Sequence, residues 1–102
     1  MRSKVRITVV KTLSTRDVFG ENPPADATFE ESCPRCKTGD SWMVPEDGSC
    51  PDGFCPWAFA DIHRDITHLR FGGDYPFVRQ PGVAVQCCTD GFRPVFFKLE
   101  RV

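Results

Sequence analysis

The sequence predicts an α+β fold, in which a small, mainly antiparallel β-sheet of about four strands packs with one main α-helix. Three observations predict it: a segment near the N-terminus that alternates with period two, one later segment with helical spacing, and a C-terminal hairpin pattern. We expect the sheet to be open or barrel-like. Residues 1–102 are expected to form a single domain, because the chain contains no repeat and no linker-like segment.

The first strand is expected at Lys4 to Lys11, where charged and apolar residues alternate and several residues are β-branched. Residues 12 to 40 follow with no sustained period. They contain Pro23-Pro24 and the first pair of cysteines. We expect a long irregular excursion here, of the kind that is usually functional in a compact domain.

A short second strand is predicted at Asp40 to Val44, with Trp42 and Val44 on one face. A helix is predicted to begin at Cys55-Pro56, since proline is favoured at the first helical position. One side of this helix carries the apolar residues Ala58, Ile62, Ile66 and Leu69. The other side carries mainly Asp61, Arg64, Asp65 and His68. Phe71-Gly72-Gly73 is expected to end the helix.

The C-terminal quarter predicts a β-hairpin formed by Val83 to Thr89, an Asp90-Gly91 turn and Phe92 to Arg101. Pro94 cannot donate a hydrogen bond to a neighbouring strand, so an edge position or a bulge is expected there. Phe96 is apolar on the otherwise polar face of this strand. That face is expected to be covered, and a homo-oligomer or a protein partner would cover it.

Charge and composition exclude several classes of partner. Thirteen basic and fourteen acidic residues give a formal net charge of −1, with no cluster of basic residues. We therefore expect no nucleic-acid partner. No apolar run approaches the length of a membrane span, and the first residues do not form an export leader. The expected location is cytoplasmic, where cysteines stay reduced or bind metal.

The six cysteines form three close pairs and are the main candidates for chemistry. Cys33-Pro34-Arg35-Cys36 resembles a zinc knuckle, and Cys50 with Cys55 could complete a tetrahedral site at the spacing C-x2-C-x13-C-x4-C. Two other interpretations stay open for these residues: small apolar side chains in a turn, or a redox pair.

Cys55 has a second interpretation, because it lies at the predicted start of the helix. The positive end of the helix dipole would favour its thiolate and make it a candidate catalytic residue. The alternative is that Cys55 is simply a capping or buried residue.

Cys87 and Cys88 are adjacent at the end of a predicted strand, so their side chains should point to opposite faces of the sheet. One is expected to face the core. The other could meet Cys33 or Cys55 across space. The candidate metal ligands are thus Cys33, Cys36, Cys55, Cys87 and Cys88, not all in one site.

Other candidate groups have simpler explanations. His63 and His68 are five residues apart and do not share a helix face, so a helical metal motif is absent. Asp61 and Asp65 are expected on a solvated, charged face beside Arg64. Arg93 could bind an anion or pair with Asp90. No phosphate-binding loop and no serine-nucleophile motif is present.

Four segments resemble a family of small uncharacterised prokaryotic proteins found largely in anaerobes. They are ITVVKT at 7–12, FCPWAFADI at 54–62, FGGDYP at 71–76 and QCCTDGFRPVFFKLERV at 86–102. The resemblance covers nearly the whole chain, and its CCTDGxRPVxFKLER ending is distinctive. It implies that shared thiol chemistry would use Cys33, Cys55, Cys87 and Cys88, because Cys36 and Cys50 have no clear counterparts. It implies no activity.

The leading expectation is a small cytoplasmic accessory or binding protein that holds a transition metal, zinc first and iron second, through cysteine thiolates. One alternative is a thiol-dependent redox protein or enzyme that uses Cys55. Another is a structural subunit of a larger assembly, in which the cysteines only pack.

Overall fold

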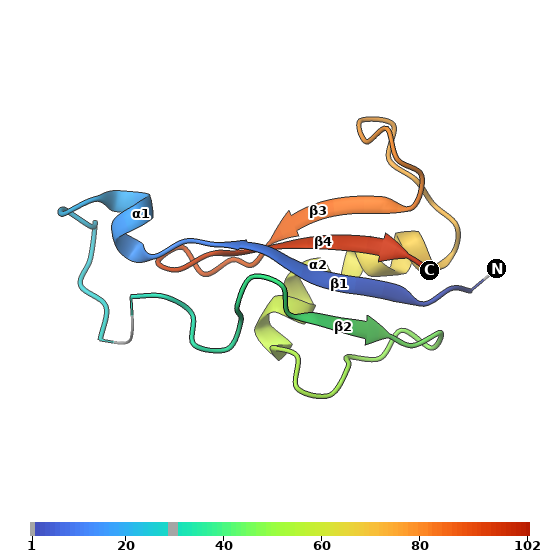
Figure 1. The fold of residues 1–102 in the computed structure, drawn as a ribbon, viewed down its shortest axis with the longest axis horizontal. Helices are drawn as coiled ribbons and strands as arrows, with labels where there is room; N and C mark the ends of the chain where they lie inside the picture. Colours follow the sequence, from blue (N-terminus) through green and yellow to red (C-terminus); the bar gives the residue numbers. More distant parts are fainter. Residues whose placement is uncertain (1, 29–30) are drawn as a thin grey trace.

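A computed structural model describes residues 2–28 and 31–102 and shows an α+β fold (Figure 1). The elements, in chain order, are β1 (Val5–Thr12), α1 (Thr15–Phe19), β2 (Ser41–Val44), α2 (Pro56–Arg70), β3 (Val83–Cys87) and β4 (Val95–Arg101). The predicted strands and the main helix are confirmed, with boundaries that move by a few residues.

The four strands form one antiparallel sheet in the order β2-β1-β4-β3. The sheet is open, because β2 and β3 lie at its two edges and do not pair with each other. The barrel-like form that the sequence allowed is therefore not adopted. The chain brings its first and last strands together at the centre, where Ile7 lies opposite Leu99 and Val9 opposite Phe97.

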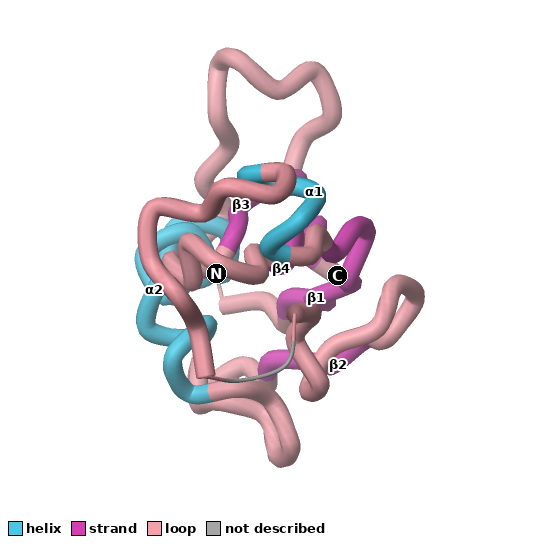
Figure 2. Tube along the Cα trace, turned by 90° about the vertical axis from the view of Figure 1, so that its left-hand side faces the viewer, coloured by secondary structure: helices cyan, strands magenta, loops and turns pink. Residues whose placement is uncertain are grey.

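The main helix, α2, covers one face of this sheet (Figure 2). Its predicted apolar side is buried and packs against the inward-facing side chains of the strands. The buried core consists of Val5, Ile7, Val9, Cys36, Val44, Phe54, Ala58, Ile62, Ile66, Leu69, Ala84, Val95, Phe97 and Leu99. Cys55 is the N-cap residue and Pro56 opens the helix, as expected. Gly72 has a φ of 87°, a left-handed conformation that glycine adopts without strain and that ends the helix.

The C-terminal hairpin differs from its prediction in two ways. The connection between β3 and β4 is longer than an Asp-Gly turn, because it runs from Cys88 to Pro94. The position of β4 is also different: it is a central strand, and Pro94 precedes it instead of weakening an edge. An irregularity does occur near the start of β4, but it lies in the neighbouring strand β1, whose register with β4 shifts between Val9 and Lys11. Proline is tolerated because its missing N–H lies outside the paired segment.

Among the described residues of 12 to 40 the structure shows a short helix, α1, that the residue pattern was not expected to form. Ser14 caps α1 by accepting a hydrogen bond from the backbone N–H of Asp17, and the Asp17 carboxylate accepts one from the backbone N–H of Ser14. This reciprocal pair is a capping box, and the spacing Ser-x-x-Asp was its signal in the sequence. Residues 29 and 30 of this segment lie outside the described part of the chain.

The expectation that Asp65 lies on a solvated face is wrong, since its exposed fraction is 1%. The hydroxyl of Tyr75, from the loop after α2, donates a hydrogen bond to Oδ1 of Asp65. The ring of His68 lies against Tyr75, with centroids 4.6 Å apart. A buried carboxylate needs such a partner, and here a residue ten positions away supplies it.

Tyr75 provides a direct test of this packing, because it is the single tyrosine of the chain. Burial and the hydrogen bond to Asp65 raise its pKa from the ordinary value of 10.0 to about 12. Its contribution to stability is therefore complete below about pH 10 and is lost as pH rises toward about 12. Near-ultraviolet titration of the tyrosinate should give a midpoint near 12 in the folded protein and near 10 in urea. Equal midpoints would contradict the Tyr75–Asp65 contact.

No helix in the described residues has the length and apolar character needed to cross a bilayer. The face of the sheet opposite α2 is only partly apolar. Val10, Met43 and Val85 are exposed on this face, and Phe96 is half-buried there.

Candidate thiol site

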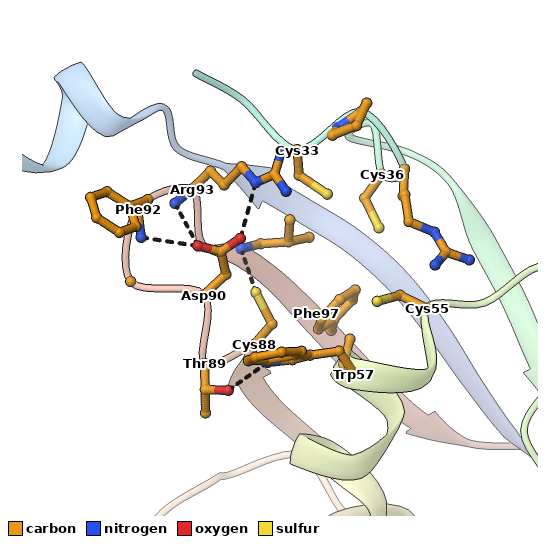
Figure 3. Close-up of a pocket in the computed structure, with 15 residues that line it drawn as sticks. Cys33, Cys36, Cys55, Trp57, Cys88, Thr89, Asp90, Phe92, Arg93 and Phe97 are labelled. Carbon is orange, nitrogen blue, oxygen red and sulfur yellow. Dashed lines mark hydrogen bonds and ion pairs between the residues drawn. The ribbon is translucent and has the colours of Figure 1, made fainter. Parts of the chain in front are cut away.

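Four of the six cysteines line one cavity of about 610 Å³. Its walls come from four segments: the loop at residues 33–36, the start of α2, the connection between β3 and β4, and the beginning of β4 (Figure 3). The lining residues are Cys33, Pro34, Arg35, Cys36, Cys55, Trp57, Ala58, Cys88, Thr89, Asp90, Gly91, Phe92, Arg93, Val95 and Phe97. The fold thus gathers thiols that are 55 residues apart in the sequence, from Cys33 to Cys88.

Cys33 and Cys36 lie on the same wall. Cys36 is buried, with 4% of its surface exposed, whereas Cys33 is half-buried against the core. Burial raises the pKa of Cys36 to about 12, and the neighbouring Cys33 and Cys55 add to this rise. A thiol with such a pKa is protonated at neutral pH and is a poor nucleophile without a cation beside it.

Cys55 lies where the sequence placed it, at the N-cap of α2. Its side chain makes no capping hydrogen bond there. It is half-buried and packs against the core beside the cavity. The sulfur is therefore available to the cavity, and its effect on the pKa of Cys36 shows that the two thiols are within electrostatic reach.

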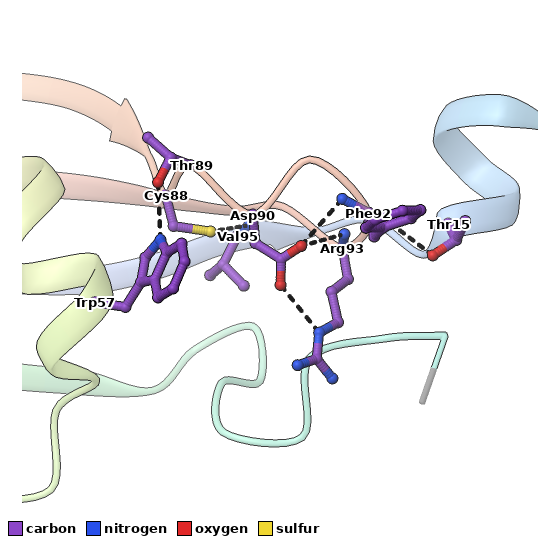
Figure 4. Close-up of polar contacts among 8 residues, drawn as sticks. All are labelled: Thr15, Trp57, Cys88, Thr89, Asp90, Phe92, Arg93 and Val95. Carbon is purple, nitrogen blue, oxygen red and sulfur yellow. Dashed lines mark hydrogen bonds and ion pairs between the residues drawn. The ribbon is translucent and has the colours of Figure 1, made fainter. Parts of the chain in front are cut away.

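Cys88 faces the cavity from the opposite side, just after β3 ends. The backbone N–H of Val95 donates a hydrogen bond to its sulfur over 3.3 Å (Figure 4). This bond and a second one from the backbone of Asp90 lower the pKa of Cys88, but burial outweighs them and raises it overall. Cys33 also raises it, so these two thiols interact across the cavity. N–H donors aimed at a sulfur stabilise its thiolate form.

The remaining two cysteines lie elsewhere. Cys87 ends β3 opposite Phe96 and is exposed, so the adjacent pair divides between two faces as expected. Cys50 is exposed and is not part of the cavity wall. Of the candidate cysteines, the cavity thus brings together Cys33, Cys36, Cys55 and Cys88 and leaves Cys87 and Cys50 outside.

A network of polar contacts fixes the connection that carries Cys88. Asp90 accepts hydrogen bonds from the backbone N–H groups of Phe92 and Arg93, and its Oδ2 pairs with Nε of Arg93 at 3.0 Å (Figure 4). Nε1 of Trp57 donates to Oγ1 of Thr89 over 2.8 Å. The connection is therefore held by its own contacts between Asp90 and Arg93 and by the contact of Thr89 with α2. Together these contacts keep Cys88 at the cavity.

The residue pattern indicated the cysteines and the Asp90–Arg93 pairing but not Trp57, which lines the cavity and is 65% exposed. Its position two residues after the candidate Cys55 could have indicated that Trp57 lies near the same site. The other His and Asp candidates do not line the cavity. Nε2 of His68 contacts the backbone oxygen of Asp74, and Asp61 accepts hydrogen bonds from Thr89.

All six cysteines are free thiols. Within residues 2–28 and 31–102, no group of three or more His, Cys, Asp or Glu side chains is arranged so that it could hold a metal ion as it stands. Joint coordination by the cavity cysteines therefore requires movement of their side chains.

Comparisons of the chain with protein-family models, with curated proteins and with solved structures gave no match. Function is therefore inferred from the residues of the cavity.

Proposed function

We propose that this chain is a small cytoplasmic binding protein whose cavity cysteines, Cys33, Cys36, Cys55 and Cys88, hold a transition metal as thiolates. The observation that carries the proposal is the convergence of four thiols from three separate segments on one cavity. Four thiolates are the usual ligand set for tetrahedral zinc or for iron.

The protonation of two of the cavity thiols, Cys36 and Cys88, makes these two poor candidates for a nucleophile. Burial raises the pKa of both Cys36 and Cys88, and nearby thiols add to the effect. Such groups remain neutral and unreactive on their own. A bound cation reverses this, because a coordinating thiol is deprotonated by the metal.

The surroundings would support the charge of such a complex. A divalent ion with four thiolates carries a net charge of −2. Arg35 is among the lining residues, while the charge of Arg93 is paired there with Asp90. Backbone N–H groups also donate to the sulfur of Cys88. Such second-layer contacts orient ligands and strengthen metal sites.

Anaerobic purification followed by elemental analysis and thiol counting tests the proposal. We expect stoichiometric metal and two freely reacting thiols, those of Cys50 and Cys87, because both are exposed and outside the cavity. After chelation in denaturant all six thiols should react. Substoichiometric metal together with six thiols that react from the start would overturn the proposal.

Exposed apolar side chains on the face of the sheet opposite α2 favour an assembly of two copies. Val85, on the edge strand β3, is 59% exposed, and Met43 and Phe96 share its face. Isologous pairing would bury this face in both copies at once. Light scattering should give twice the mass of the chain, and Val85→Asp should give a monomer. The control variant, Phe77→Ser, changes an exposed residue of the loop before β3 and should leave the mass unchanged. A monomeric wild type would contradict self-association.

A further inference from the structure

Cys33 and Cys36 are close in space as well as in the sequence. Pro34 and Arg35 between them form a turn. Such a turn brings the Cα atoms of its first and last residues within about 7 Å, and a disulfide spans Cα atoms about 4.4–6.8 Å apart. Pro34 occupies the second position of the turn, where its fixed φ favours this geometry. The backbone therefore places the two cysteines within reach of a disulfide.

The side chains of the two cysteines also meet. Burial, the charges of Cys33 and Cys55 and a hydrogen bond between the thiols of Cys36 and Cys33 raise the pKa of Cys36. A hydrogen bond raises the pKa of the thiol that donates it, so Cys36 donates and the sulfur of Cys33 accepts. Figure 3 shows the two side chains as neighbours on their loop. Their sulfur atoms are thus within hydrogen-bond distance, and both are free thiols.

The two thiols differ in access. Cys33 is half-buried at the cavity wall, whereas only 4% of Cys36 is exposed. Trp57 and Phe92 line the same cavity and offer apolar surface to a small molecule. A reactant in the cavity can therefore meet the sulfur of Cys33 first, and Cys36 has to react only with its neighbour.

We propose that Cys33 and Cys36 form a dithiol pair that reduces low-molecular-weight disulfides by thiol–disulfide exchange. The thiolate of Cys33 attacks one sulfur of the incoming disulfide. A mixed disulfide forms, the original S–S bond breaks, and one thiol leaves with the proton that Cys33 gave up. The sulfur of Cys36 then attacks that of Cys33, and the second thiol leaves with the proton of Cys36 as the Cys33–Cys36 bond forms. Two electrons have then passed from the chain to the incoming disulfide, which is reduced to two thiols.

The raised pKa makes Cys36 a poor first nucleophile but does not prevent this second step. Burial persists, but the charge of Cys33 is lost and the hydrogen bond to its sulfur is weakened once that sulfur is part of the mixed disulfide. The two sulfurs are also neighbours, so the step is intramolecular. The inference goes beyond the proposed metal site and does not rest on it, because the exchange uses the metal-free thiols.

The test is incubation of the metal-free full chain with oxidised glutathione in the absence of oxygen, followed by alkylation of free thiols and digestion with trypsin. Trypsin cleaves after Arg35 and separates Cys33 from Cys36, so that only a disulfide keeps the two peptides together. We expect this cross-linked pair in mass spectra, and its loss when excess reduced glutathione is added before alkylation. The double variant Cys50→Ala/Cys87→Ala, which lacks the two cysteines outside the cavity, should form the same cross-link.

Single variants separate the two steps. Cys36→Ala should stop at the mixed disulfide, with one glutathione bound to Cys33, whereas Cys33→Ala should leave the buried Cys36 unmodified. Circular dichroism shows that each variant is folded. The inference is overturned if the wild-type chain forms no Cys33–Cys36 cross-link, or joins either residue to a different cysteine instead. A chain that binds metal but forms no such cross-link would overturn this inference alone and leave the metal site standing.

Discussion

Replacing Cys36 with alanine is expected to weaken metal binding at the proposed thiolate site by more than about 100-fold. Changes to groups that only support a metal ligand already cost 10- to 100-fold, so loss of a ligand should cost more. Cys36 is the most buried of the cavity cysteines, and its thiol interacts with those of Cys33 and Cys55. Alanine is preferred over serine because it places no unpaired hydroxyl in the core.

The matched control is Cys50→Ala, which also removes a thiol but lies outside the cavity. Competition with a chromophoric chelator measures both affinities, and circular dichroism shows that each variant is folded. Equal affinities for the two variants would mean that Cys36 is a packing residue and not a ligand.

Replacing Phe97 with alanine should have the largest effect on stability, lowering the free energy of unfolding by about 3–5 kcal/mol. Phe97 is fully buried at the centre of the sheet, opposite Val9, and its ring meets that of Phe54 edge-on at 5.5 Å. Removing the ring leaves a void beneath the cavity that the strands cannot close, since β4 is paired on both sides.

Phe77→Ala is the control for this substitution, because Phe77 is 80% exposed and its loss should change stability by less than about 0.5 kcal/mol. Urea unfolding measures both variants. A cost for Phe97→Ala below about 1 kcal/mol would contradict its central place in the core.

Most of the fold could be predicted from the sequence, because the strands and the main helix show local periodicity of apolar residues. Period-two alternation located β1 and β4, and the spacing of Ala58, Ile62 and Ile66 located the buried side of α2. The buried position of Asp65 could not be predicted in this way. It depends on Tyr75, which returns from the following loop to satisfy the carboxylate.

The candidate site could be predicted only in part, for a related reason. Local spacing indicated Cys33 with Cys36 and the helix-start position of Cys55. It also paired Cys55 with Cys50, which the structure places outside the cavity. Cys88 reaches the cavity because β3 and β4 are joined by a long connection tied to α2 through Thr89. Such a contact depends on strand order and loop length and joins residues far apart in the chain, so no local spacing in the sequence predicts it.

X-ray absorption spectroscopy at the metal edge of anaerobically purified protein tests the central claim most directly. If Cys33, Cys36, Cys55 and Cys88 hold the metal, each metal atom should show four sulfur neighbours at about 2.3 Å. A first shell made of nitrogen and oxygen atoms would contradict a thiolate site in this cavity.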